Sequence, residues 1–457
     1  MSRFLCAPGE PCLDATTNPR FIYRVYSWNW NTENYESQPG SGSFNPFTPS
    51  LSFAFPQIDP LDVGSYKSAI VAVNATEFVE SPALGVLVIA PDNKAGSDQA
   101  LELFMPPSVL DDAAIRQAVH LYVTNPSVAY TLYGDISEWD TIYVTNLDRL
   151  FSSGNIPLNS FNGNISKWDT SHVTSMSWMF YNASFFNGDL SEWKTNLVTS
   201  MYGMFASASS FNGDVSSWDT SNVKRMAFMF ANATSFNADV SSWNTTQVET
   251  TYGMFDSASS FNRNLSSWIT SCVTSMAWMF HKASSFDGNL SIWDTGRVTS
   301  MYGMFASAVS FKGSFMLPWN TSLVTTMSWM FNYASLFNGN VSTWNVGRVT
   351  AMYGIFDSAI SFNGDVSSWN TSSVTTMSWM FRKALSFSRD LSKWKTGKVK
   401  GMYAMFDMAT SFNGNVSTWD TSSVTTMSWM FTKASVFNGD VSKWNTRQVV
   451  SMYGRYV

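Results

Sequence analysis

Apolar residues recur with a period of 25 residues from Phe161 to the end of the chain, and this periodicity dominates the sequence. The segment 211–231 reads FNGDVSSWDTSNVKRMAFMFA, and near copies of it follow one another. One extra residue, within FKGSFMLPW, lengthens a single step to 26. A fixed period of this length is typical of a solenoid, in which each unit buries its apolar face only against its neighbours. The tryptophans that mark the units are Trp168, Trp193, Trp218, Trp243, Trp268, Trp293, Trp319, Trp344, Trp369, Trp394, Trp419 and Trp444.

The pattern within each unit predicts two short elements. After the tryptophan, apolar residues such as Val173, Met176 and Phe180 recur at the spacing of one helical face. The Asp-Thr-Ser run before them supplies side chains that cap helices. The segment FNGDVSSW before the tryptophan predicts one brief strand and a turn. Stacked units of this kind predict a right-handed α/β solenoid, with a ladder of short strands on one side and helices on the other.

Polar residues also form columns along the expected array. Asn164, Asp189, Asp214 and Asp239 occupy equivalent positions in turns. We expect these side chains to form hydrogen bonds with backbone groups of adjacent coils, because buried backbone groups need partners.

Residues 1–106 differ from the repeats and predict a small antiparallel β domain, a sandwich or a half-barrel. Runs rich in β-branched and aromatic residues alternate with clusters of Pro, Gly, Asn and Asp. Pro106-Pro107 marks the expected boundary, because a double proline stops a strand. The runs are Phe21–Trp30, Ser50–Phe55, Ala69–Val73, Leu84–Ala90 and Ala100–Met105.

Residues 107–159 predict a helical cap and a degenerate first repeat, before an array of twelve repeats over residues 160–457. Ile115, Ala118, Val119 and Tyr122 lie at helical spacing, with Asp111 or Asp112 as the N-cap and a restart at Pro126. Terminal repeats of solenoids are commonly atypical. The degenerate repeat contains Trp139, Asp140, Val144, Leu147, Leu150 and Phe151, with four extra residues within 153–159.

The units alternate, so that two 25-residue coils form one 50-residue unit. Odd units carry M-S/A-W-M-F and even units carry M-Y-G-M-F, which places large aromatic residues beside small ones in the next coil. One interpretation is packing, in which each ring lies over a glycine of the adjacent coil. The other is an exposed aromatic stripe that binds another protein, because large apolar surface patches mark interaction sites. The stripe comprises Trp178, Tyr202, Phe228, Tyr252, Trp278, Tyr302, Trp329, Tyr353, Trp379, Tyr403, Trp429 and Tyr453.

Composition and charge restrict the function further. Hydrophobic residues make up 45% of the chain and aromatic residues 16%, which predicts an ordered core. The net charge of −6 argues against nucleic-acid binding, which needs a basic surface. We expect neither a secretory signal in the first thirty residues nor a membrane span. Cys6 and Cys12 are compatible with a loop disulfide or with free thiols. The Asn-X-Ser/Thr sequences that could accept N-linked glycans arise mostly from the repeat itself.

No catalytic, cofactor-binding or metal site is expected. His120, His172 and His281 sit in different contexts, and no phosphate-binding or zinc-protease motif occurs. The Asp and Asn columns invite a calcium ladder. Lys194, Ile269 and Lys395 interrupt the position after the tryptophan, however, so that these residues are interpreted as turn-capping groups.

The string W-D-T-S-x-V-T-x-M-x-x-M-F, preceded by F-N-G-D/N-V/I-S, resembles the short repeat of bacterial surface lipoproteins. That repeat is a relative of the BspA-type leucine-rich repeats, and similar arrays occur in algae and large DNA viruses. The entry segment AVHLYVTNPSVAYTLYGDISEWDTIYVTNLDRLF is similar to the start of such arrays, and the resemblance covers about residues 111–457. It implies a leucine-rich-repeat-like interaction scaffold with no catalytic residues. We expect no counterpart here of the lipoprotein signal and wall anchor of the bacterial members.

Three functions follow as hypotheses. The first is a non-enzymatic structural protein that binds other proteins or itself, as a minor capsid or surface component of a virion. The second is an adhesin at a cell surface, and an enzyme in the β domain is a third alternative. The array stops within a repeat at MYGRYV, where Arg455 replaces the usual methionine, so we expect a partner or the chain's own tail to cover the last coil.

Overall fold

The structure is a computed structural model that describes residues 109–152, 161–314 and 319–454, together with the backbone of six strands nearer the N-terminus. It divides into two compact units, Met1–Trp139 and Asp140–Val457. The division falls between the boundaries expected at residues 107 and 160.

The strands of the first unit pair antiparallel. The central strand β1 forms a sheet with β2, β3 and β5, and β4 pairs with β6. Four of the six strands fall within the predicted runs, whereas β2 and β3 were not predicted. The run Leu84–Ala90, Pro106-Pro107, Cys6 and Cys12 lie outside the described residues. The strand bounds are β1 Phe21–Asn29, β2 Asn34–Ser37, β3 Gly42–Phe44, β4 Ser52–Phe53, β5 Ala69–Val73 and β6 Leu101–Glu102.

Two helices close the first unit as the sequence predicts. Helix α1 (Asp112–Thr124) begins after Asp111, whose carboxylate accepts hydrogen bonds from the backbone N–H groups of residues 113 and 114. Helix α2 (Pro126–Tyr133) follows at once, with Asn125 as its N-cap. A 3₁₀ turn, η2 (Ile136–Glu138), leads to Trp139, the last residue of the unit.

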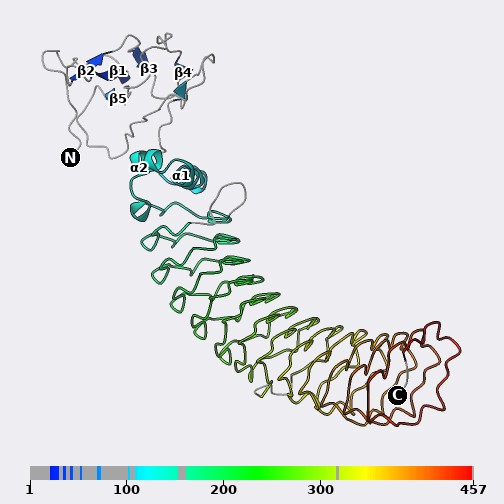
Figure 1. Ribbon diagram of the computed structural model, residues 1–457. Coiled ribbons are helices and arrows are strands. Elements are labelled where there is room, and N and C mark those ends of the chain that lie inside the picture. The colour runs from blue at the N-terminus through cyan, green and yellow to red at the C-terminus, as the bar shows by residue number, and fades with distance from the viewer. Residues whose placement is uncertain are drawn as a thin grey trace. The chain divides into compact units, whose positions relative to one another are not determined.

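The second unit is a stack of coils in which each coil pairs with the next (Figure 1). Its first coil contains the degenerate repeat, since Asn146 pairs with Ser175. The step of 26 residues is absorbed between Ser300 and Thr326, which still pair. Thirteen residues, one in each coil, form a continuous series of parallel bridges: Asn146, Ser175, Ser200, Arg225, Thr250, Ser275, Ser300, Thr326, Ala351, Thr376, Gly401, Thr426 and Ser451.

The described residues of the stack contain no α-helix, so the helix expected after each tryptophan is wrong. Val173, Met176 and Phe180 are buried as predicted. The backbone N–H groups of Met176 and Phe180, however, donate to the carbonyl oxygens of Ser200 and Met204 in the next coil, at 3.0 and 2.8 Å. A helix would direct those N–H groups to carbonyls four residues earlier. The bridges also lie after the tryptophan, not in the FNGDVSSW segment where a strand was expected.

Aromatic rings of successive coils stack through the core. Trp218 and Trp243 lie with centroids 6.3 Å apart and nearly parallel, and Phe205 lies 5.6 Å from Phe230. The indole nitrogen of Trp218 donates to the carbonyl of Leu190 in the preceding coil, at 3.0 Å. Buried tryptophans such as Trp218 therefore contribute both apolar area and, through the indole N–H, a bond between coils.

Threonine provides a second ladder of bonds between coils. The hydroxyl of Thr220, in the W-D-T run, is buried and donates to the carbonyl of Asn244 at 3.0 Å. Equivalent bonds recur in other coils, for example from Thr270 to the carbonyl of Asp294. The run expected to cap a helix therefore joins neighbouring coils.

The turn residues act within their own coil, contrary to the expectation of bonds between coils. The carboxylate of Asp214 accepts the backbone N–H of Ser216 at 2.9 Å, which is an Asx turn. Asn164, Asp189 and Asp239 accept the N–H two residues ahead in the same way. The side-chain ladder between coils is formed instead by the asparagine after the phenylalanine, as where Asn187 accepts from the N–H of residue 212.

These Asx turns predict a specific acid sensitivity. Hydrogen bonds from the serine two residues ahead lower the pKa of Asp189, Asp214 and Asp239 below 3.8 in the folded chain. Because the pKa is lower folded than unfolded, the contribution to stability is present above the unfolded pKa and is lost as pH falls through the folded value. Changing all three to Asn, the residue at position 264, should make the urea midpoint less dependent on pH below about 4. 

The measurement is urea unfolding of the parent and the triple variant at a series of pH values. Glu249→Gln, which changes an exposed carboxylate outside these turns, should leave the parent's pH dependence in place. Equal pH dependence in parent and triple variant would contradict the assignment.

Candidate functional site: the aromatic ridge

The twelve residues of the predicted stripe occupy two neighbouring columns of the stack, which we call the aromatic ridge. One column alternates Trp or Phe with Gly, as in Trp178, Gly203 and Phe228. The column before it alternates Tyr with Ser or Ala, as in Tyr202 and Ala227. Each coil therefore contributes one large ring, and the ring changes column at every step.

The backbone explains the alternation. The residue in the first column has a left-handed conformation in every coil, with φ of 59° at Trp178, 60° at Gly203 and 57° at Phe228. This conformation costs roughly 1–2 kcal/mol for residues other than glycine. A Cβ at Gly203 would lie 2.3 Å from the Trp178 ring, and one at Gly303 would lie 2.5 Å from the Trp278 ring. The rings of Trp178, Phe228, Trp278 and Trp329 are therefore packed over a glycine of the next coil, which is the packing interpretation of the sequence.

Residue 404 is alanine where the other even coils have glycine, and the ring of Trp379 in the preceding coil takes a different position. Trp379 lies 6.1 Å from Tyr403, whereas Trp278 lies 5.1 Å from Tyr302. The Trp379 ring instead contacts Trp329 of an earlier coil, at 5.6 Å. The Cβ of residue 404 occupies the space that a ring fills elsewhere, so Trp379 is displaced along the ridge.

Ring-to-ring contacts join ridge residues in three groups, 178–252, 278–302 and 329–403. Most are edge-to-face, the arrangement that aromatic quadrupoles favour. Their centroid distances run from 4.9 Å to 6.1 Å. The contacting pairs are Trp178–Tyr202, Tyr202–Phe228, Phe228–Tyr252, Trp278–Tyr302, Trp329–Tyr353, Tyr353–Trp379 and Trp379–Tyr403.

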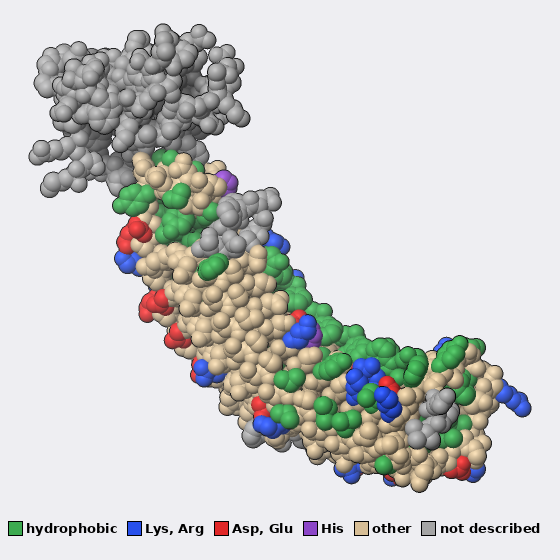
Figure 2. All heavy atoms as spheres, viewed as in Figure 1, with side chains coloured by type: hydrophobic (Ala, Val, Ile, Leu, Met, Phe, Trp, Pro, Cys, Tyr) green, Lys and Arg blue, Asp and Glu red, His purple; other side chains and the backbone are tan. Residues whose placement is uncertain are grey.

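The ridge is nevertheless accessible to solvent. Ten of its twelve rings are half-buried and two are exposed. Figure 2 shows hydrophobic side chains gathered in a band that follows the stack. Packing over glycine and surface exposure are thus compatible, because rings such as Trp178 and Trp278 cover a glycine with part of their surface and leave the rest open.

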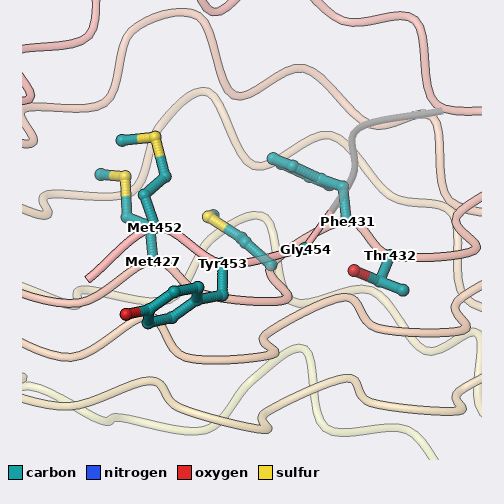
Figure 3. A pocket seen from close by; sticks show the side chains of 7 residues that line it. Met427, Phe431, Thr432, Met452, Tyr453 and Gly454 are labelled. Atoms are coloured by element: carbon teal, nitrogen blue, oxygen red, sulfur yellow. The ribbon is translucent and has the colours of Figure 1, made fainter.

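The ridge is most open at the last two described coils. Trp429 is 45% exposed and Tyr453, in the coil after it, is 73% exposed. Figure 3 shows Tyr453 and Met452 beside Met427 and Phe431, which help to line a small pocket formed by these two coils. The surface at this point is apolar and aromatic.

Charged groups lie along one side of the ridge. The guanidinium of Arg382 is 5.2 Å from the Trp379 ring centroid and binds the carboxylate of Asp357 at 2.9 Å. The amide of Asn332 donates to the other carboxylate oxygen of Asp357 at 3.3 Å. Arg149 lies 5.6 Å over Trp178, a second cation–π contact.

Burial controls the titration of this cluster. Asp357 is only 1% exposed, and burial raises the pKa of its carboxyl above the usual range although Arg382 opposes the rise. Burial likewise raises the pKa of Asp407 and of Tyr353. A second pair joins His281 to Asp256 at 2.7 Å, with the imidazole against the Trp278 ring.

Catalytic and metal-binding groups do not gather among the described residues. No set of three or more His, Cys, Asp or Glu side chains there is placed to hold a metal ion. A helix of sufficient length and apolar character to cross a bilayer is also not found in that part of the chain.

Sequence reasoning missed the Asp357–Arg382 pair and the left-handed backbone beneath the rings. The pair could have been noticed because its column holds Ala206, Ala231 and Ala306 in other coils. A glycine that alternates with tryptophan in one column was also a signal of positive φ, since glycine adopts that conformation freely.

A comparison with protein families matches one family, described as Mycoplasma protein of unknown function, DUF285. The matched segments are residues 125–240, 158–268, 211–317, 313–411 and 387–456. They overlap and together cover most of the 457 residues, including the whole repeat region up to residue 456. No curated protein and no solved structure matches the chain significantly.

The ring-over-glycine packing predicts opposite effects for two substitutions. Gly303→Ala should lower stability by about 1–3 kcal/mol, because alanine is strained at φ 60° and its Cβ would displace the Trp278 ring. Ala404→Gly should raise stability by about 1 kcal/mol. Urea unfolding midpoints measure both effects.

Gly347→Ala is the matched control, since serine occupies the equivalent position 322 and the change should move the midpoint little. A Gly303→Ala midpoint no lower than that of Gly347→Ala would show that the glycine is not required beneath the ring.

Proposed function

We propose that this chain, which belongs to the DUF285 family of Mycoplasma proteins of unknown function, is a non-enzymatic repeat scaffold that assembles through its aromatic ridge. The observation that carries the proposal is the ridge itself, in which every coil from Trp178 to Tyr453 places one large, partly exposed ring on the same line. A non-enzymatic role is further supported by the polar columns. Their side chains are used in turns and in bonds between coils, as at Asp214 and Thr220.

The period of the ridge favours a second copy of the chain as the partner. A ring changes column at each coil, so the surface repeats every two coils. Only a partner with the same spacing can match such a surface along its whole length, and a second copy has that spacing. Two ridges related by a twofold axis would present the same patch to each other, the usual geometry of soluble dimers.

The length of the ridge is sufficient for such an interface. Eleven steps separate the coils of Trp178 and Tyr453, and paired strands lie about 4.8 Å apart, so the ridge extends over roughly 50 Å. A stable interface buries about 800 Å² on each partner. A strip of that length needs to be only about 15 Å wide to supply this area.

The more specific assignments of fold class, repeat family and location are also proposals or predictions. We class the stack as a solenoid of the leucine-rich-repeat-like kind, and its parallel bridges between coils support that class. Membership of the BspA-type repeats, a place as a minor capsid component of a virion and a role as a cell-surface adhesin stay predictions. Assembly through the ridge requires none of the three.

Light scattering across a concentration series tests the proposal on the full chain. The parent should show a mass above the 51.0 kDa monomer that rises with concentration. The triple variant Tyr252→Ala, Tyr302→Ala, Tyr353→Ala should stay monomeric, because it removes ring area at positions where alternate coils already carry Ala or Ser. Circular dichroism confirms that the variant keeps the parent's fold.

The matched control is Tyr130→Ala, a change of an exposed tyrosine in helix α2 that should leave association unchanged. Should the triple variant lose its fold, Tyr302→Ala alone replaces it, with an expected several-fold weaker association. A parent that stays monomeric at all concentrations overturns the proposal, as does a folded variant that associates like the parent.

A further inference from the structure

Side chains that the fold needs recur in every coil of this stack, so an exposed residue that departs from its column is a candidate for function. The column two residues before the phenylalanine of each F-N-G segment, such as Ser209 before Phe211, is a clear case. It is mainly serine or threonine, and the hydroxyl has a structural role. Ser209, for example, donates to the carbonyl of Ser184, and Ser259 donates to that of Thr234, both at 3.3 Å.

Three coils replace this hydroxyl with an aliphatic side chain, at Val309, Ile360 and Leu385. The intervening coil keeps Ser335 in the column and instead carries Leu336 in the next one, where most coils have serine. The same coil carries an exposed tyrosine, Tyr333, in a column that is mainly Asn, Ser and Lys.

The four aliphatic side chains and Tyr333 form a surface that we call the aliphatic patch. It extends over four consecutive coils, and its members are between 37% and 47% exposed: Val309, Tyr333, Leu336, Ile360 and Leu385. Serine would satisfy the fold at three of the positions, as it does in neighbouring coils. Their apolar character is therefore unexplained by packing, and clustered exposed apolar groups mark interaction sites.

The charge beside the patch is positive on balance. Arg382 and Lys383 immediately precede Ala384 and Leu385 and are partly exposed, and the partly exposed carboxylate of Asp407 interacts with Arg382, Lys383 and Lys433. The carboxylate of Asp357 is buried and bonded to Arg382, Asn332 and Ser358. Figure 2 shows hydrophobic side chains next to a group of Lys and Arg side chains on the face that it presents.

We propose that the aliphatic patch binds a short extended segment of a different protein, which presents aliphatic side chains beside carboxylates. Lys383 complements the carboxylates, since Arg382 is already paired with Asp357, and the patch receives the aliphatic groups. The size of the patch indicates a segment. Three coil steps span roughly 14 Å, the length of four or five extended residues.

A second copy of the chain is a poorer match for this patch than for the ridge. Five partly exposed side chains supply much less than the about 800 Å² that each partner of a stable dimer buries. The patch is also confined to four coils and is not periodic, so the two-coil spacing of a second copy gives no advantage here.

Fluorescence anisotropy with short labelled peptides tests the proposal on the full chain. The probe alternates leucine with glutamate over about eight residues. One comparison peptide alternates leucine with lysine, and another alternates serine with glutamate. The leucine–glutamate peptide should bind at least about tenfold more tightly than either comparison, because it alone offers both complementary features.

The test variant is Ile360→Ser with Leu385→Ser, which restores the regular residue of the column and so preserves the fold. It should weaken binding of the leucine–glutamate peptide by about tenfold or more. Lys383→Ser, matched by Ser358 in the preceding coil, should reduce the preference for glutamate over lysine. The control is Ile292→Ser, which removes an exposed aliphatic residue outside the patch and should leave binding unchanged.

Three results would overturn the proposal. These are equal binding of the three peptides, equal binding to parent and double serine variant, or loss of self-association in the double serine variant, which would assign the patch to a second copy. The ridge variants should still bind the leucine–glutamate peptide. Failure of the ridge proposal and failure of the patch proposal therefore give different results.

Discussion

The structure of the repeats depends on the hydrogen bonds that each coil's backbone makes to the next coil. N–H groups of Met176, Trp178 and Phe180 donate forward to the following coil, and the same bonds recur along the stack. Coils paired in this way lie about 4.8 Å apart, which brings equivalent side chains of successive coils into contact. Flat rings can stack and hydroxyls can reach the next backbone at this separation, which accounts for the stacked aromatic core and the threonine ladder.

The aromatic ridge is where this spacing conflicts with side-chain volume. The left-handed backbone at residues such as Trp178 turns the ring across the next coil, and only a glycine there leaves space for it. The ridge is exposed because its rings rest on the backbone of a neighbouring coil and not within the core. The exposed aromatic surface therefore follows from the left-handed backbone and the glycines that place the rings outside the core. The aliphatic patch differs, because serine could replace its residues without loss of a core contact.

Much of the core could be predicted from the sequence, but not its local conformation. Val173, Met176 and Phe180 are buried as their period indicates, yet steps of three and four residues occur in successive turns as well as in helices. The ring-over-glycine pairing was among the predicted alternatives, since Trp178 and Gly203 are one repeat apart. The left-handed backbone was not, because tryptophan rarely adopts it. Bonds between coils were expected from the column of Asp214, which forms Asx turns instead, and not from the column of Asn187, which forms the ladder. Asp and Asn side chains suit either role.

The alternation of ring and glycine also limits how the gene for such a chain can change in length. Recombination between repeats that removed one 25-residue coil would place two odd coils together, with Trp278 facing the ring of Trp329 and no glycine between them. Removal of two coils would restore the pairing at the junction. Expansion and contraction of the array are therefore expected to proceed by 50-residue steps. The segment gained or lost in evolution would then be two coils long, although the structural repeat is one coil.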